Sequence, residues 1–178
     1  MSTYYHVSKV RLPAGTTLAS HFFPASNDEG MLRAIADAEA IGPEALRTLL
    51  ATEKFIAVKA SEPPEAPSVY IELIYETVRK SEFPERPSRW DCIYLFDDVG
   101  PADRFLKEIL QGNGVILVCT IESGEPFTAD MNLLQAPDVQ KRDVGKAKMV
   151  EAARAYWSGT MSDSPWPETL ASGRVVVS

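Results

Sequence analysis

The alternation of hydrophobic and polar positions divides the chain into short segments with two different periods. Segments rich in β-branched and aromatic residues indicate strands, because such side chains fit a half-buried pleated surface. Strands are therefore expected at residues 4–10, 92–96, 115–121 and 174–177, with residues 130–134 also extended. Clusters of proline, glycine and polar residues between these segments indicate loops at residues 21–24, 61–67 and 83–89.

Apolar residues that recur every three or four positions indicate helices. The clearest case follows the proline-rich connection, where positions 70, 73, 74, 77 and 78 share one helical face. In the same segment Glu76 and Lys80 have the spacing of a helical ion pair. Further helices are expected at residues 28–40 and 44–52, from the turn at residues 97–101 to residue 111, and at residues 144–157. In the third of these, Phe105, Leu106 and Ile109 are expected to face inward.

The order of these elements bears on the fold class. Helices and strands do not alternate regularly, and no internal repeat is visible. Regular alternation would favour a doubly wound parallel sheet, whereas this order favours an α+β fold. The length of 178 residues is near the usual size of one domain. We therefore expect residues 1–178 to form a single α+β domain.

Composition and charge narrow the classes of function. The chain is 45% hydrophobic and 24% charged, which is typical of a globular protein. Its net charge of −7 disfavours general nucleic-acid binding, because neutralising phosphates requires a basic face. No apolar run approaches the ~20 residues of a membrane-spanning helix. The first residues contain no basic region followed by an apolar stretch. We expect a cytoplasmic protein, unless a specialised export system recognises another targeting signal.

The two cysteines, Cys92 and Cys119, both lie in apolar, β-branched segments. This context indicates buried thiols in neighbouring strands, since cysteine is among the most buried residue types. A disulfide or redox pair is the alternative. A metal site is disfavoured, because two cysteines and two histidines do not supply a ligand set at useful spacing.

Standard catalytic motifs are absent. The chain lacks a phosphate-binding P-loop, a dinucleotide-binding glycine turn and a nucleophile elbow. One candidate position is the first strand, where alternation places His6 and Ser8 on the same face. There they could bind a sugar or an amide, although a structural histidine is the simpler interpretation.

Two further positions carry candidate chemistry. Arg89 precedes a buried strand, where its planar guanidinium suits a phosphate or a carboxylate; a role in bracing the loop is the alternative. Tyr94, within that strand, can pack in the core or stack on a flat ring. Glu168 lies between Trp166 and the last strand, so partial burial would raise its pKa and suit it to catalysis. Simple exposure of Glu168 is the alternative.

Taken in order, the histidine strand, the tyrosine strand and the late glutamate resemble the ADP-ribosyltransferase-like superfamily. More closely, the chain resembles a poorly characterised bacterial family assigned to that superfamily by remote similarity. The segments that carry this resemblance span nearly the whole chain and are residues 5–7, 83–84, 87–89, 130–134, 156–159, 168 and 170.

The resemblance implies a split β-sheet core with flanking helices and NAD as the substrate. His6 would bind the nicotinamide-side ribose, with Ser8 and Arg89 also contacting NAD. Tyr94, preferred over Phe96 for its hydroxyl, would stack on nicotinamide, and Glu168 would stabilise the positively charged sugar. Glu168 departs from the pattern in preceding its strand by several residues, and the fallback carboxylates are Glu122 and Glu125.

The implied activity is ADP-ribosyl transfer to a macromolecular or small-molecule acceptor, as a toxin, effector or modification enzyme. The alternatives are a catalytically inactive member of the fold that binds a nucleotide-like ligand or a protein partner, and an interaction or inhibitor protein that uses the acidic surface.

Overall fold

The computed structural model describes residues 2–22, 67–135 and 146–178. The helices expected at residues 28–40 and 44–52, and most of the proline-rich connection, lie outside these ranges. The described part of the chain is a mixture of helices and two antiparallel sheets, which confirms the α+β class. No helix in these ranges is both long and apolar enough to cross a membrane.

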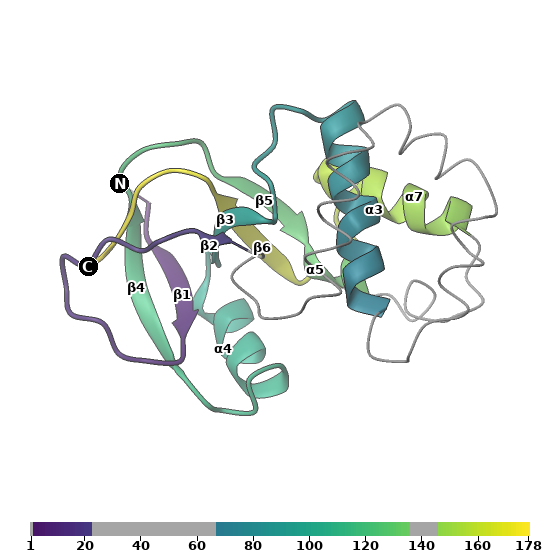
Figure 1. Ribbon diagram of the computed structural model, residues 1–178. Coiled ribbons are helices and arrows are strands. Elements are labelled where there is room, and N and C mark those ends of the chain that lie inside the picture. The colour runs from purple at the N-terminus through teal and green to yellow at the C-terminus, as the bar shows by residue number, and fades with distance from the viewer. Residues whose placement is uncertain (1, 23–66, 136–145) are drawn as a thin grey trace.

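The strands form a three-stranded and a four-stranded sheet (Figure 1). In the first sheet the order is β1-β4-β7, with bounds Tyr4–Ser8, Val115–Ile121 and Val175–Val177. In the second it is β2-β3-β6-β5, with bounds His21–Phe22, Asp91–Leu95, Pro167–Ala171 and Phe127–Asp130. The expected strands at 4–10, 92–96, 115–121 and 174–177 are all present; the bounds of 115–121 are as predicted, and the ends of the others differ by at most two residues.

Four helices accompany the sheets in the described ranges. Their bounds are Pro67–Glu82 for α3, Val99–Glu108 for α4, Met131–Gln135 for α5 and Lys146–Trp157 for α7. Helix α4 begins at the N-cap Asp98, whose carboxylate accepts a 2.7 Å hydrogen bond from the Gly100 N–H. It is followed by Gly112, whose positive φ of 79° turns the chain back toward β4.

The elements pack in layers around two main apolar clusters. Helices α3 and α7 lie side by side and cover one face of the β2-β3-β6-β5 sheet (Figure 1). The opposite face of that sheet packs on the β1-β4-β7 sheet through Leu95, Leu117 and Val175. Helix α4 covers the far face of the smaller sheet, where Tyr5 and Val7 join Phe96 and Trp166. The predicted alternation along the first strand is therefore confirmed, because Tyr5 and Val7 share a face.

The two sheets meet at the end of strand β3. Tyr5 of β1 and Phe96, the residue after β3, exchange two backbone hydrogen bonds of 2.8 Å. On its other edge β3 pairs with β6, with Tyr94 opposite Leu170. Strand β3 thus lies between β2 and β6 within its sheet, and the residue that follows it links this sheet to β1.

Two local predictions are wrong. Residues 21–24 were expected to form a loop, but His21 and Phe22 pair with Cys92 and Asp91 as strand β2. This pairing depends on the exposed edge of β3, which no local pattern reveals. Residues 130–134 were expected to be extended, but β5 ends at Asp130 and helix α5 follows. The Asp130 carboxylate accepts a 2.9 Å hydrogen bond from the Asn132 N–H, which caps the new helix.

Two side-chain predictions also need correction. Ile109 was expected to face inward, but it is 43% exposed, because α4 ends one residue before it. Cys92 and Cys119 are buried and free, as core thiols should be. They do not occupy neighbouring strands, however, since β3 and β4 belong to different sheets and the two thiols pack in different apolar clusters.

Candidate functional site

Arg89 lies at the centre of a buried polar cluster between strand β3 and helices α3 and α7. Its Nε and Nη2 donate to the Glu72 carboxylate of α3 at 3.0–3.2 Å. Its Nη1 donates to the Tyr156 hydroxyl of α7 at 2.7 Å and, over a very short distance, to Glu168 Oε1 of β6. Arg89 is only 7% exposed, so these contacts replace its hydration. We call these four residues the Arg89 cluster.

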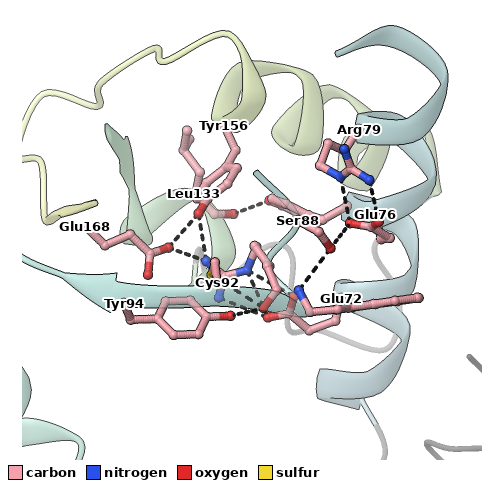
Figure 2. Close-up of polar contacts among 12 residues, drawn as sticks. Glu72, Glu76, Arg79, Ser88, Cys92, Tyr94, Leu133, Tyr156 and Glu168 are labelled. Atoms are coloured by element: carbon pink, nitrogen blue, oxygen red, sulfur yellow. Dashed lines mark hydrogen bonds and ion pairs between the residues drawn. The ribbon is translucent and has the colours of Figure 1, made fainter. Parts of the chain in front are cut away.

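The loop before β3 holds Arg89 in place. The buried Glu76 carboxylate accepts two hydrogen bonds from Arg79, at 2.8 and 2.9 Å, and one from the Ser88 hydroxyl at 3.0 Å (Figure 2). Arg79 also donates to the carbonyl of Arg86 at 2.9 Å, which ties the loop to α3. The expected partner of Glu76 was Lys80; the Lys80 ammonium instead lies 5.7 Å from the centre of the Trp90 ring.

Glu168 is buried in β6, with 3% of its surface exposed. The sequence placed it ahead of its strand, but it belongs to a strand of its own that pairs with both β3 and β5. Its Oε1 accepts from both Arg89 and the Tyr156 hydroxyl, the latter at 2.7 Å. Burial raises the pKa of Glu168, and the Arg89 charge and the Tyr156 hydroxyl offset this only in part.

The two oxygens of Glu168 have different surroundings. Oε1 has two donors, whereas Oε2 receives no hydrogen bond from the described residues. Figure 2 shows this second oxygen directed toward the side on which the Tyr94 ring lies. Tyr94 and Glu168 belong to the same face of the sheet, because Tyr94 pairs with Leu170 and Glu168 is two residues away from Leu170.

The Tyr94 side chain makes two contacts with Arg89, one through its hydroxyl and one through its ring. Its hydroxyl donates a 2.5 Å hydrogen bond to the carbonyl of Arg89. The Arg89 guanidinium lies 5.1 Å from the centre of the Tyr94 ring, which is within the range of a cation–π contact. Burial raises the pKa of Tyr94 well above its usual value, so the hydroxyl stays protonated. The ring therefore already faces one cation.

His6 reaches the backbone of Tyr94 from strand β1. Its Nδ1–H donates a 2.9 Å hydrogen bond to the Tyr94 carbonyl. Burial lowers the pKa of His6, although this backbone contact opposes the shift, so the ring is neutral at pH 7. In that tautomer Nε2 is an acceptor. Half-buried Ser8 follows at the end of β1, where its Oγ accepts from the Val10 N–H at 3.2 Å.

The structure thus joins Arg89 directly to both Tyr94 and Glu168, and it links His6 to the Tyr94 backbone through one hydrogen bond. Ser8 contacts its own turn. The fallback carboxylates are both exposed, and Glu122 pairs with Arg174 at 3.2 Å. Of the two ligands that the sequence suggested for Arg89, phosphate and carboxylate, the described residues supply carboxylates. Among these residues no group of three or more acidic, histidine or cysteine side chains could hold a metal ion.

Sequence reasoning did not single out Glu72 and Tyr156 as parts of the site. Glu72 lies 17 residues from Arg89 and Tyr156 lies 67 residues from it, so no local pattern joins them. Tyr156 had one weak signal: it adds a hydroxyl to the apolar face of the last long helix, beside Trp157. A buried hydroxyl requires a partner, and here the partner is Glu168.

Comparison with known proteins gives one family. No curated protein matches the chain. The profile of a family described as "Protein of unknown function (DUF2441)" matches residues 35–178, which include β3, β6, α3, α7 and every member of the Arg89 cluster. The match covers most of the chain, and the protein therefore belongs to this DUF2441 family.

Proposed function

We propose that the protein is an NAD-dependent ADP-ribosyltransferase in which the two sheets form an ADP-ribosyltransferase-like split core. The observation that carries this proposal is that His6, Tyr94 and Glu168 come from three strands that meet, since β3 pairs with β6 and the backbone just after β3 pairs with β1. His6 is joined to the Tyr94 carbonyl by a 2.9 Å hydrogen bond, and Tyr94 and Glu168 share one face of the β2-β3-β6-β5 sheet.

The proposed reaction breaks the bond between C1′ of the ribose and the ring nitrogen of nicotinamide. The electron pair of this bond leaves with nicotinamide, which removes the positive charge of that ring and places positive charge on the sugar. An oxygen or nitrogen of the acceptor then bonds to C1′ and loses its proton to solvent or to a nearby base. With water as the acceptor, the product is free ADP-ribose.

The charge of the Arg89 cluster suits this reaction. Two carboxylates, Glu72 and Glu168, surround one guanidinium, which leaves a net charge of −1 when both are ionised. A preorganised negative charge in a water-poor site stabilises a sugar that becomes positive in the transition state. Glu168 would act at the ribose, and the Tyr94 ring would face the nicotinamide cation.

His6 and Ser8 would contact the nicotinamide-side ribose. Because His6 Nδ1–H is used by the Tyr94 carbonyl, the acceptor at Nε2 is the atom available to a ribose hydroxyl. Ser8 lies two residues further along β1 and supplies a hydroxyl that both donates and accepts. The acceptor of ADP-ribose would bind outside this group of residues.

A second candidate function is a catalytically inactive domain that binds a nucleotide-like ligand or a protein. The observation in its favour is that Glu168 Oε1 is already used by Arg89 and Tyr156, while Arg89 also lies over the Tyr94 ring. In this alternative the Arg89 cluster braces the sheet against α3 and α7, and it performs no chemistry.

The test is incubation with millimolar NAD, followed by measurement of nicotinamide release and of a thermal shift. Glu168→Gln keeps an oxygen that can accept from Arg89 and Tyr156, so this variant is expected to fold. The transferase proposal expects it to bind NAD but to release nicotinamide at least about 100-fold more slowly than wild type. Glu122→Gln, an exposed carboxylate outside the cluster, is the matched control and should keep wild-type activity.

Each outcome separates the candidates. Nicotinamide release that is lost in Glu168→Gln supports the transferase. A thermal shift with NAD but no release, in wild type and variant alike, favours the inactive binding domain. The absence of both release and shift would contradict the proposed use of NAD.

A further inference from the structure

The two oxygens of Glu168 are held unequally, and this asymmetry suggests a role for Tyr156. Oε1 accepts from the Tyr156 hydroxyl at 2.7 Å and from Arg89 Nη1. Those two groups also contact each other, since Nη1 donates to the Tyr156 hydroxyl at 2.7 Å. The three groups form a closed triangle around Oε1. Rotation of the carboxylate would break two charge-assisted hydrogen bonds at once.

The Tyr156 ring is itself locked in place. It makes edge-to-face contacts with Tyr75, Phe127 and Trp157, with ring centres 4.8–6.3 Å apart. The indole N–H of Trp157 donates a 2.7 Å hydrogen bond to the carbonyl of Tyr75, which fixes the end of α7 against α3. The phenol is completely buried, and burial raises its pKa well above the usual value. Tyr156 is therefore a permanent donor.

We propose that Tyr156, together with Arg89, is a positioning residue that anchors Glu168 Oε1 and leaves Oε2 to accept from the substrate. This inference rests on the proposed function in one respect only, namely that the substrate hydroxyl belongs to the ribose of NAD. Tyr156 does not touch the substrate in this arrangement. It fixes the plane of the carboxylate and directs the oxygen without described donors toward the side of Tyr94 (Figure 2).

The same contacts set the ionisation of Glu168. The titratable and charged side chains that act on the carboxylate are Arg89, Tyr156, Glu72, Tyr94 and Cys92. Of these, Arg89 and Tyr156 favour the ionised carboxylate, and Glu72 disfavours it. The phenols and the thiol are neutral at pH 7, because burial raises their pKa values. Removing the Tyr156 hydroxyl should therefore raise the pKa of Glu168.

The experiment compares wild type with Tyr156→Phe by two readouts. The first is the titration of Glu168, followed by carbon NMR of glutamate labelled at the side-chain carboxyl and assigned with Glu168→Gln. The pKa of Glu168 is expected to rise in Tyr156→Phe. The second is NAD cleavage across pH: kcat should fall about 10- to 100-fold with little change in KM, and the acidic limb should move to higher pH.

Tyr75→Phe is the matched control. Tyr75 is also a buried tyrosine beside the cluster, and its hydroxyl donates a 2.8 Å hydrogen bond to the carbonyl of Leu133. This variant loses one buried hydroxyl but no contact to Glu168. It should be destabilised to a similar degree while keeping the wild-type pKa of Glu168 and the wild-type pH profile. A purely structural Tyr156 would behave like this control.

Arg89→Lys provides a second variant if Tyr156→Phe does not fold. One ammonium cannot reproduce the fork that serves Glu72, Glu168 and Tyr156, so the pKa of Glu168 should again rise and kcat should fall. An unchanged pKa of Glu168 in whichever of the two variants folds would overturn the inference. If wild type does not cleave NAD, the proposed function fails, and the NMR titration still decides whether Tyr156 and Arg89 hold the carboxylate.

Discussion

The Tyr156 hydroxyl and the Glu168 carboxylate form a buried hydrogen bond of 2.7 Å between helix α7 and strand β6. Both residues also contact Arg89, which precedes β3, and Arg89 in turn binds Glu72 of α3. One charged group thus joins two helices and two strands. Because the ions are removed from water, the loss of any one member leaves its partners unpaired in the interior.

Replacing Arg89 with leucine should strongly destabilise the protein. The side chains of Arg89 and Glu168 are only 9% and 3% exposed, so the variant would leave a buried carboxylate without its cation. Breaking a buried ion pair in this way costs about 3–5 kcal/mol. The free energy of unfolding in urea measures this cost. Lys107→Ala, which removes an exposed pair with Asp103, is the control and should cost at most about 1 kcal/mol. Equal losses in the two variants would contradict the buried-pair argument.

Local sequence patterns predicted the helices and strands in which apolar residues recur at a regular spacing. Helix α3 was predicted from its apolar face, and Ile74 and Val78 of that face are buried against α7 and the sheet. Strand β2 and helix α5 were missed for a physical reason. Two residues of β2 are ordered by the edge of β3, and the five residues of α5 are too few to show a helical period.

The candidate site was predictable only in part, because its contacts also join residues that are far apart in the sequence. Arg89 was singled out because its guanidinium, just ahead of a buried strand, suits a phosphate or a carboxylate, and Glu168 because partial burial beside Trp166 would raise its pKa. The sequence could not name those partners, since Glu72, Tyr156 and Glu168 approach Arg89 from separate elements. His6 was placed correctly on the first strand. Its contact with the Tyr94 carbonyl depends on how the two sheets meet, which no local pattern encodes.

Gly173 is required by the turn that follows β6. A Cβ atom at this position would lie 1.8 Å from the carbonyl oxygen of Ser123. Because that oxygen belongs to the backbone, Gly173→Ala must shift one of the two turns, at a cost of about 1–3 kcal/mol or more. For a domain of this size the melting temperature should fall by about 3 °C for each kcal/mol. Ser172→Ala, at the exposed neighbouring position, should leave the melting temperature unchanged within about 2 °C. Equal melting temperatures for the two variants would mean that the turns separate easily.

Both cysteines should be unreactive in the folded protein. Cys92 and Cys119 are completely buried, and burial raises their pKa values to about 12 and about 11. Since the thiolate is the reactive form, labelling with a disulfide reagent at pH 8 should be slow in buffer and rapid in guanidinium. Ser172→Cys places a thiol at an exposed position as the control, and one thiol per chain should then react at once. Rapid labelling of the wild-type protein in buffer would show that the strands open readily.

Asp130 should make the protein acid-sensitive. The residue is fully buried, and burial alone would raise its pKa. However, its carboxylate accepts hydrogen bonds from the Ser162 hydroxyl and from the N–H groups of Trp166, Ser162 and Asn132, and together these lower the pKa below the usual value. A lowered pKa means that the unfolded chain binds the proton more tightly. The stabilisation is therefore complete above about pH 4 and is lost as the pH falls through the lower pKa of the folded state.

The variant Asp130→Asn tests this pH dependence directly. It should be less stable than wild type at pH 7 by about 2–4 kcal/mol, since it loses charge-assisted hydrogen bonds that tie α5 and the segment before β6 to one carboxylate. The difference between variant and wild type should shrink as the pH is lowered below about 4, because the wild-type carboxylate is then neutralised as well. Urea unfolding at pH 7, 4 and 2.5 measures both effects, with Asp103→Asn on the exposed face of α4 as the control. If the difference between Asp130→Asn and wild type were the same at all three pH values, the ionised carboxylate would not be what stabilises this turn.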